Sequence, residues 1–382
     1  MAQWNRVPLI DYIELIGGGT PKTTVPEYWN GNIPWLSVKD FNNDKRYVYS
    51  TEKHISQSGF ENSPTKMLHK DDIIISARGT VGEIAMIPFD MAFNQSCYGI
   101  RASRGIDQPF LYYLLKNCIS QLKRMTHGSV FDTITRDTFA NIEVDIPDAE
   151  TQKRISSVLA DIDNKIEVND AINDNLHQQA ATLFKALFVD HAPFDGTMPP
   201  NWTISTLGDV TEMGAGGDKP KESSPVKTPL CPYPIYSNGI NDYGLYGYTN
   251  EPKIKVESVT VSARGTIGYV CLRHIPYVPI VRLVTLIPDT KVLSAKYLYL
   301  YLRQLHITGT GTTQQQLTVP DFRKTEIVIP DKNTMDAFTE TVTPLFEQIW
   351  ANEDENTKLA EVRDALLPKL MSGEIDVSAV QL

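Results

Sequence analysis

Hydrophobic residues recur at alternating steps of four and three along residues 150–190, and the pattern returns along residues 333–372. This spacing is typical of a long helix whose apolar seam packs in a coiled coil. Both seams carry two asparagines at matching positions, and Arg363 stands where the first seam has Ala180. The first seam consists of Ile155, Leu159, Ile162, Ile166, Asn169, Asn173, Leu176, Ala180, Leu183 and Leu187, and the second, 183 positions later, of Phe338, Val342, Leu345, Ile349, Asn352, Asn356, Leu359, Arg363, Leu366 and Leu370.

The two asparagines at matching positions of both seams indicate that the two helices pack on each other. An asparagine in a seam costs stability but fixes register and partner. If the helices run antiparallel, their polar middles coincide, so we predict an antiparallel coiled coil. The alternative is two separate amphipathic helices, each lying on its own domain. We expect Asp148 and Asn333 as N-caps, and Pro344 should kink the second helix or delay its start by a turn.

The segments before the two helices also repeat. Residues 76–82 read Ser-Ala-Arg-Gly-Thr-Val-Gly, and residues 262–268 read Ser-Ala-Arg-Gly-Thr-Ile-Gly. Residues 110–115 and 297–302 are both rich in aromatic residues and leucine at helical spacing, and a strand ending in Pro-Asp precedes each long helix. A repeat of about 185 residues is a duplicated module rather than a solenoid.

The order is therefore globular, helix, globular, helix. We assign residues 1–149 and 191–332 to two globular regions of α+β class, residues 150–190 and 333–372 to the long helices, and residues 373–382 to a tail. Residues 20–60 and 218–255 follow matching starts but barely resemble each other. Because loops on a rigid scaffold usually carry recognition, this contrast predicts two different reading surfaces in equivalent positions.

Charge is distributed unevenly along the chain. The net charge is −10, which at first argues against a nucleic-acid partner. However, residues 1–149 hold 15 basic and 17 acidic groups and residues 191–332 hold 14 and 12, so the whole excess lies in the two helical stretches. A neutral domain can still present a basic face to DNA.

The remaining bulk features are those of a cytoplasmic protein. No apolar run is long enough to span a membrane, and the first residues lack the apolar core of a signal peptide. Four cysteines, Cys97, Cys118, Cys231 and Cys271, are scattered without metal-ligand spacing, which fits free thiols in a reducing compartment. The seven histidines form no recognisable ligand set.

The repeated Arg-Gly-Thr sequences are the strongest candidates for contact with DNA. Arg78 and Arg264 can each present a guanidinium fork to a phosphate or a guanine edge. The alternative is a tight turn whose arginine pairs with a local carboxylate. The candidate DNA-binding residues are Thr20, Lys22, Lys39, Arg78, Gly79, Thr80, Arg101, Ser129, Thr133, Arg136, Lys219, Lys221, Asn238, Arg264, Gly265, Thr266, Arg282, Thr312, Thr313, Gln314, Gln315 and Gln316.

Two glycine-rich stretches, residues 17–19 and 214–217, match neither a dinucleotide-binding motif nor a P-loop. We interpret them as flexible turns beside the DNA. Residues 312–316 could read base edges or could instead form a polar loop that caps the following strand. No Asn-Pro-Pro-aromatic tetrad, nuclease core or Ser/His/Asp set is present, so the sequence favours a binding protein without catalytic residues or a metal site.

The combination of features resembles the specificity subunit of type I restriction–modification enzymes. The tandem Ser-Ala-Arg-Gly-Thr-x-Gly sequences, the paired Pro-Asp-to-helix junctions and the ending Leu-Leu-Pro-Lys-Leu-Met-Ser-Gly-Glu-Ile at residues 366–375 carry the resemblance, which spans the whole chain.

The resemblance implies two target recognition domains that each read one half of a bipartite, asymmetric sequence in double-stranded DNA. It also implies that the helices set the spacer and dock two modification (methyltransferase) subunits. Restriction and motor subunits would join them, and S-adenosylmethionine, ATP and Mg²⁺ would act on those partners. A second reading is a single-chain DNA methyltransferase or nuclease with its own recognition domains, and a third is a scaffold that does not bind DNA.

Overall fold

The structure is a computed structural model that describes residues 4–126, 133–309 and 316–378. It divides into two compact units. The first unit comprises residues 1–169 and 354–382, and the second comprises residues 170–353. Each unit thus contains one globular region together with half of each long helix.

The two long helices are α4 (Ala149–Phe188) and α8 (Lys332–Met371). Asp148 caps α4 by accepting the N–H of Thr151 at 2.9 Å, as expected. The cap of α8 is Asp331, which accepts the N–H of Thr334 at 3.2 Å, so the expectation of Asn333 is wrong. Of the two alternatives for Pro344, the delayed start is also wrong, because α8 begins twelve positions before it at Lys332, and the kink stays a prediction.

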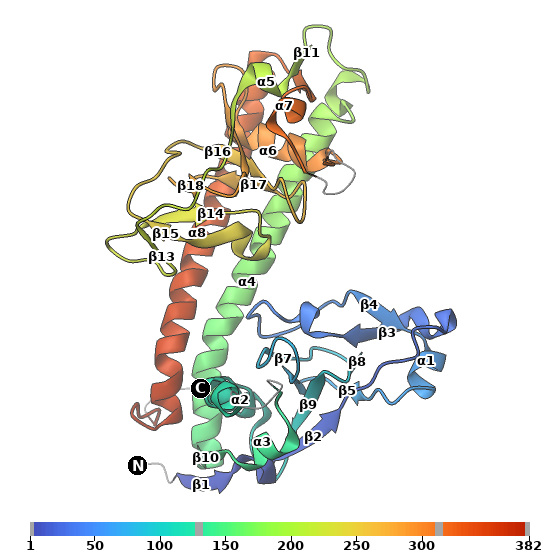
Figure 1. Cartoon of the computed structure of the whole chain (residues 1–382), viewed down its shortest axis with the longest axis vertical. Coiled ribbons are helices and arrows are strands. Elements are labelled where there is room, and N and C mark those ends of the chain that lie inside the picture. The colour runs from blue at the N-terminus through green and yellow to red at the C-terminus, as the bar shows by residue number, and fades with distance from the viewer. Residues whose placement is uncertain (1–3, 127–132, 310–315, 379–382) are drawn as a thin grey trace. The chain divides into compact units, whose positions relative to one another are not determined.

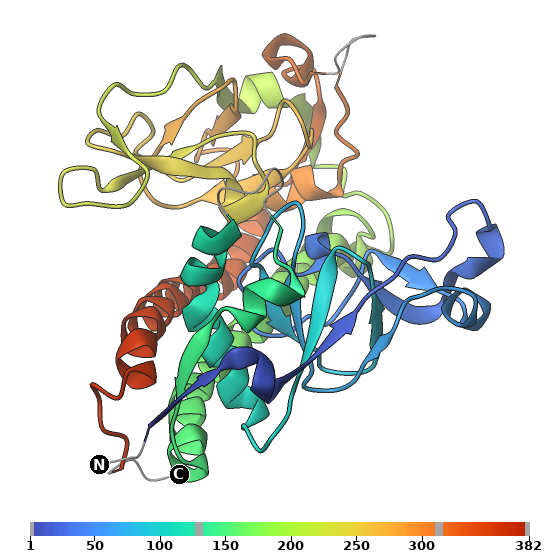
Figure 2. The same ribbon diagram turned by 60° about the horizontal axis from the view of Figure 1, so that its bottom comes forward.

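The helices pair antiparallel within each unit, which confirms the predicted coiled coil (Figure 1). In the first unit, Nδ2 of Asn169 donates to Oδ1 of Asn356 at 2.8 Å. In the second unit, Nδ2 of Asn352 donates to Oδ1 of Asn173 at 2.8 Å. Figure 2 shows the same two helices side by side from another direction. The four asparagines therefore meet in two pairs, and each pair satisfies amide groups that lie within an otherwise apolar seam.

The seam departs from its predicted course near the end of α4. Leu183 was expected to be buried, but its side chain is 37% exposed, whereas Phe184 and Phe188 are buried. Ring contacts join Phe184 and Phe188 to Phe338 of α8. An α-helix turns once every 3.6 residues rather than 3.5, so an uncoiled helix drifts out of a heptad register and presents the next position to its partner.

The first unit contains three sheets. Their strand orders are β2-β9-β6-β7, β4-β3-β8-β5 and β1-β10, and all pairs are antiparallel except β3–β8. The elements are β1 (Asn5–Pro8), β2 (Ile13–Gly17), β3 (Trp29–Leu36), β4 (Lys53–Ile55), α1 (Gln57–Glu61), β5 (Met67–Leu68), β6 (Ile73–Ser76), β7 (Ile84–Met86), β8 (Met91–Phe93), β9 (Cys97–Ala102), α2 (Gln108–Thr126), α3 (Arg136–Ala140) and β10 (Glu143–Ile146).

The second unit repeats two of these sheets and forms the third with its parallel pair at the edge. Its sheets have the orders β12-β19-β16-β17, β13-β15-β14-β18 and β11-β20, with β14–β18 as the parallel pair. The elements are β11 (Thr203–Thr206), α5 (Leu207–Val210), β12 (Thr211–Ala215), β13 (Ser223–Ser224), β14 (Tyr233–Tyr236), β15 (Leu245–Thr249), β16 (Ser258–Val261), β17 (Val270–Arg273), β18 (Val278–Pro279), β19 (Val284–Pro288), α6 (Ala295–Gln304), α7 (Val319–Phe322) and β20 (Glu326–Ile329).

Each unit has its own main hydrophobic core, formed where the first of its four-stranded sheets meets the helices. The core of the first unit joins Ile73 and Ile75 of β6 to Leu111 of α2 and Leu159 of α4. The core of the second unit joins β16, α6 and the paired halves of α4 and α8 in the same way. The α+β class is confirmed, and the duplication seen in the sequence is a duplication of structure.

Candidate nucleic-acid interface

Two equivalent loops leave the central strands of the two units, at residues 76–82 after β6 and at residues 262–268 after β16. In each, the hydroxyl of the first serine accepts a backbone N–H seven positions later, from Glu83 to Ser76 at 2.8 Å and from Tyr269 to Ser262 at 2.9 Å. The carbonyl of the same serine accepts the N–H of Gly82 or Gly268, both at 3.0 Å. These shared bonds explain why serine and glycine recur at these positions.

The tips of the two loops point into open space. Gly79 and Gly265 adopt φ values of +78° and +69°, a left-handed conformation that other residues rarely adopt. A Cβ added at either glycine would meet nothing within 4 Å. The flanking Arg78, Thr80, Arg264 and Thr266 are exposed. The loops therefore present an arginine, a bare stretch of backbone and a threonine to the solvent in the same order.

A second segment runs beside each loop. In the first unit, the N–H of Ile134 donates to the carbonyl of Ala77 at 3.0 Å, and Thr133 forms a β-bridge with Arg78. In the second unit, the N–H of Leu317 donates to the carbonyl of Ala263, also at 3.0 Å. These contacts bring Thr133 beside Arg78, so two of the predicted candidates lie together.

Gln316 orients the arginine of the second loop. Its Oε1 accepts hydrogen bonds from Nε and Nη2 of Arg264 at 3.1 and 2.9 Å. Among the described residues, neither Arg78 nor Arg264 has a carboxylate within ion-pairing distance, so the alternative of a turn held by a local ion pair finds no partner there. Both guanidinium groups keep donor capacity for an anion or a base edge.

Asn238 has a structural role at the second loop. Its Oδ1 accepts the N–H of Ala263 at 2.7 Å, and its Nδ2 donates to the carbonyl of Val281 at 2.7 Å. In the first unit a backbone group does this work, since the N–H of Ala77 donates to the carbonyl of Ser96 at 2.8 Å. The side chain of Asn238 therefore connects the start of the loop to residue 281, next to the exposed Arg282. It supports the backbone of the loop and does not belong to the exposed Arg-Gly-Thr tip.

Several predicted residues lie away from the loops or have other partners. Arg101 is at the far end of β6 and β9 from Arg78, and it donates from Nε and Nη2 to the carboxylate of Asp72 at 2.8 and 2.6 Å. The hydrogen bond to Asp72 raises the pKa of Arg101. Lys39 lies 4.0 Å from Glu52, and Lys219 lies over the ring of Tyr246. None of these residues contacts the Arg-Gly-Thr loops in the described structure, and neither does the exposed Lys221.

The N-terminal candidates form a separate group in the first unit. Thr20 donates to Oε1 of Gln95, an exposed residue next to Ser96, whose carbonyl also accepts the N–H of Arg78 at 3.2 Å. Gln95 is not among the candidate residues predicted from the sequence, although the polar run Asn-Gln-Ser between two apolar strands could have indicated it. Arg136 donates to the carbonyl of Leu15 at 3.4 Å, and Lys22 is exposed. Ser129, Thr312, Thr313, Gln314 and Gln315 lie outside the described residues.

Three of the six glycines in the two glycine-rich stretches are packed closely against other backbone, whereas a Cβ at Gly17, Gly214 or Gly217 would meet nothing within 4 Å. A Cβ on Gly18 would lie 2.1 Å from the carbonyl oxygen of Asn94, and one on Gly19 would lie 2.4 Å from the backbone nitrogen of Thr65. A Cβ on Gly216 would lie 2.8 Å from the backbone nitrogen of Ile280. At these three packed glycines the interpretation as flexible turns is corrected, since glycine is needed where two backbones approach closely.

The described part of the chain contains no group of three or more His, Cys, Asp or Glu residues that could hold a metal ion. Its helices are too short or too polar to cross a membrane.

Comparison with known proteins places this arrangement in a family. Residues 1–178 and 199–361 match the family model described as the type I restriction modification DNA specificity domain. The chain is 28% identical to the type I restriction enzyme MjaIX specificity subunit of Methanocaldococcus jannaschii, over 98% of this chain and 94% of that protein. It is 26% identical to the HindI specificity subunit of Haemophilus influenzae, over 70% of this chain and 77% of that protein.

A solved structure shows the same fold. The S subunit of a type I restriction–modification system from M. genitalium superposes with a TM-score of 0.57 at 16% identity, covering 97% of this chain and 96% of that one. The family model alone covers most of the sequence and includes both copies of the repeat. The chain therefore belongs to the type I restriction modification DNA specificity family.

Proposed function

We propose that the chain is the DNA-binding specificity subunit of a type I restriction–modification complex, in which each unit reads one half of a bipartite, asymmetric site. The observation that carries the proposal is the pair of exposed Arg-Gly-Thr loops. Each loop follows a buried strand, is held by the same serine hydrogen bonds and leaves its arginine without a carboxylate among the described residues. A forked donor on a rigid frame suits phosphate or guanine recognition.

The surroundings of the two loops differ, which supports unlike half-sites. Thr133 stands beside the loop of the first unit, where the second unit has Gln316 in contact with Arg264. A hydroxyl and an amide offer different donors and acceptors to a base pair. Sequence recognition would then come from the segments that diverge between the units, and the shared loops would contribute affinity.

The helices would set the spacer between the half-sites and dock two modification subunits, with restriction and motor subunits joining them. Catalysis would reside on those partners, together with S-adenosylmethionine, ATP and Mg²⁺, and this chain would hold no catalytic residues. The cytoplasm is the expected compartment, and the free cysteines Cys97, Cys118, Cys231 and Cys271 fit that expectation.

The test is methylation by the reconstituted complex. The full-length chain is combined with its modification subunits and S-adenosylmethionine on random duplex DNA, and the methylated positions are mapped by sequencing. We expect one bipartite motif with two different halves. Methylation or cleavage of DNA by the purified chain alone would instead support a single-chain enzyme. Duplex binding that is insensitive to both salt and sequence would contradict DNA reading altogether.

The spacer role has its own test. One heptad is inserted into α4 and a matching heptad into α8, so that the seam stays continuous. If the helices set the distance between the half-sites, the gap in the methylated motif lengthens while both halves stay the same. An unchanged gap would refute the spacer role and leave the reading role standing.

A further inference from the structure

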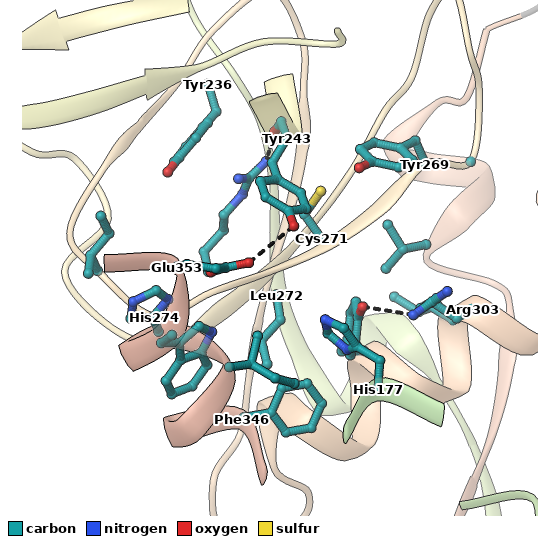
Figure 3. Close-up of a pocket in the computed structure, with 18 of the residues that line it drawn as sticks. His177, Tyr236, Tyr243, Tyr269, Cys271, Leu272, His274, Arg303, Phe346 and Glu353 are labelled. Carbon is teal, nitrogen blue, oxygen red and sulfur yellow. Dashed lines mark hydrogen bonds between the residues drawn. The ribbon is translucent and has the colours of Figure 1, made fainter. Parts of the chain in front are cut away.

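The second unit contains a cavity of about 420 Å³ that runs along the whole of β17 (Figure 3). Every residue that lines it lies within residues 170–353. The walls are rich in rings, namely Tyr236, Tyr243, Tyr269, Tyr299, Phe346 and Trp350. The DNA-reading role proposed above makes no use of this cavity.

β17 is the edge strand of its sheet. In the described residues it pairs with β16 and with no other segment. The matching strand of the first unit, β7, has its outer edge covered by residues 46–48. The N–H of Met86 donates to the carbonyl of Arg46 at 2.6 Å, and the N–H of Val48 donates to the carbonyl of Met86 at 3.2 Å.

Leu272 occupies the position of Met86, because each lies ten residues after the first serine of its Arg-Gly-Thr loop. It lines the cavity, and no other described segment pairs with its outer edge. The outer N–H and C=O groups of an edge strand are a template for another extended chain. The cavity thus lies at the outer edge of β17, which corresponds to the edge of β7 that residues 46–48 cover in the first unit.

The charged residues around residues 44–48 of the first unit indicate which side chains a segment bound in the cavity of the second unit would carry. In the first unit, Asp44 lies two residues before Arg46, and its carboxylate accepts hydrogen bonds from Lys116 at 2.8 Å and from Arg363 at 3.0 Å. The counterpart of Lys116 is Arg303, which lines the cavity and donates to the hydroxyl of Tyr299 at 3.0 Å. Among the described residues, no carboxylate lies within ion-pairing distance of Arg303.

The part of the cavity wall that Phe346 and Trp350 form is suited to an apolar side chain. Phe346 and Trp350 stand at the positions of Asp163 and Glu167 in the first unit, where Glu167 binds the guanidinium of Arg46. Among the described residues, the buried Nδ1 of His177 has no hydrogen-bond partner, and burial together with nearby Arg303 lowers the pKa of His177. Oε1 of Glu353 accepts a hydrogen bond from the hydroxyl of Tyr243 at 3.1 Å.

We propose that the cavity binds an extended segment of a partner protein, which adds as a strand along β17 and places a carboxylate on Arg303. The carbonyl of one residue of the segment would accept the N–H of Leu272. The acidic residue would come two positions earlier, as Asp44 does before Arg46, and a large apolar side chain would enter the ring of aromatic residues. Main-chain hydrogen bonds would provide affinity and the two side chains would provide specificity.

The test uses the full-length protein and three acetylated peptides that copy residues 42–49, with Phe, Leu or Arg at the position of Arg46. Binding is followed by titration and by hydrogen exchange at the amide of Leu272. We expect the Phe or Leu peptide to bind and to slow exchange at Leu272. Asn in place of the aspartate of the peptide should weaken binding by about tenfold, since a charge-assisted hydrogen bond is lost.

Two protein variants and a control separate the possible outcomes. R303Q should weaken binding by about tenfold, whereas K291Q, which removes the same charge from an exposed position outside the cavity, should leave it unchanged. L272P removes the outward N–H and should weaken binding of the Phe and Leu peptides in the titration. The R303Q change is at an exposed side chain, so it tests the proposal even if L272P fails to fold.

Equal binding to R303Q and K291Q would overturn the proposal, as would failure of all three peptides to bind at about 1 mM. A concentration-dependent dimer of the full-length protein that R303Q removes would assign the cavity to a second copy of this chain. That result would also overturn the assignment to a partner protein.

Discussion

Nη1 of Arg363 donates to Oδ1 of Asp163 over 2.9 Å, and both side chains are buried between α8 and α4 of the first unit. Asp163 also accepts the hydroxyl of Tyr113 at 2.7 Å. At the matching positions of the second unit stand Ala180, Phe346 and Leu300, all fully buried. At these three positions the first unit therefore holds a buried ion pair and its tyrosine partner, whereas the second unit packs apolar side chains.

Removal of Arg363 should destabilise the first unit strongly. Arg363→Met leaves the carboxylate of Asp163 buried without its cation, and we expect a loss of about 3 kcal/mol or more in urea unfolding. Replacing both partners, Asp163→Leu with Arg363→Met, should recover most of that loss, because an apolar pair leaves no buried charge uncompensated. Unfolding of Arg363→Met at the urea concentration of the wild type would show that the pair contributes little.

Asp331 should stabilise α8 in a pH-dependent manner. Its side chain accepts a hydrogen bond from the hydroxyl of Thr334 at 2.7 Å, which lowers the pKa of Asp331. A carboxyl with a lowered pKa contributes stability above its unfolded pKa and loses it as the pH falls through the folded value. Asp331→Ala should therefore cost about 1 kcal/mol at pH 7, and the difference should shrink as the pH falls below the ordinary carboxyl range.

The matched control for this change is Asn333→Ala. Asn333 is exposed and lies inside the helix, so we expect an effect of a few tenths of a kcal/mol at most. Thermal unfolding of both variants between pH 3 and pH 7 provides the measurement. An equal loss in the two variants, or a loss from Asp331→Ala that persists at the lowest pH, would argue against capping by the ionised carboxylate.

Adjacent glycines should differ in their tolerance of alanine. A Cβ on Gly18 would lie 2.1 Å from the carbonyl oxygen of Asn94, whereas one on Gly17 would meet nothing within 4 Å. Gly18→Ala should therefore force the backbones apart and cost about 1–3 kcal/mol, while Gly17→Ala should be near neutral in the same thermal scan. Similar midpoints for the two variants would mean that residues 17–19 can rearrange, as the interpretation as flexible turns implied.

The two loop arginines should act on different halves of the recognised sequence. Arg78→Ala and Arg264→Ala should each weaken duplex binding by about tenfold or more and reduce its dependence on salt. If an arginine contacts a base, the loss should vanish for DNA mutated in one half-site only, and the affected half should differ between the two variants. Binding to competitor duplexes with one altered half provides the measurement, and Lys291→Ala, at an exposed cation outside the candidate DNA-binding residues, is the control.

The sequence by itself determined the duplication, the two long helices and their antiparallel pairing. These features are written in local periodicity, and the asparagines at matching positions specify which partner and which direction satisfy their amides. The repeated Ser-Ala-Arg-Gly-Thr-x-Gly sequence also identified the exposed loops, because its serine and glycines are needed by the turn itself.

Only the tertiary structure decided how distant side chains use their polar groups. Arg101 pairs with Asp72 and Asn238 ties Ala263 to Val281, and neither partner is marked by spacing along the chain. The same limit applies to Arg363, which stands where the first seam has Ala180. Its partner Asp163 lies opposite it on α4, and the spacing of the seam does not indicate this pair. Periodicity along the sequence indicates which face of an element is buried. It does not indicate which side chain pairs with a buried charge, or whether another segment covers the edge of a strand, because these depend on segments that meet only when the chain folds.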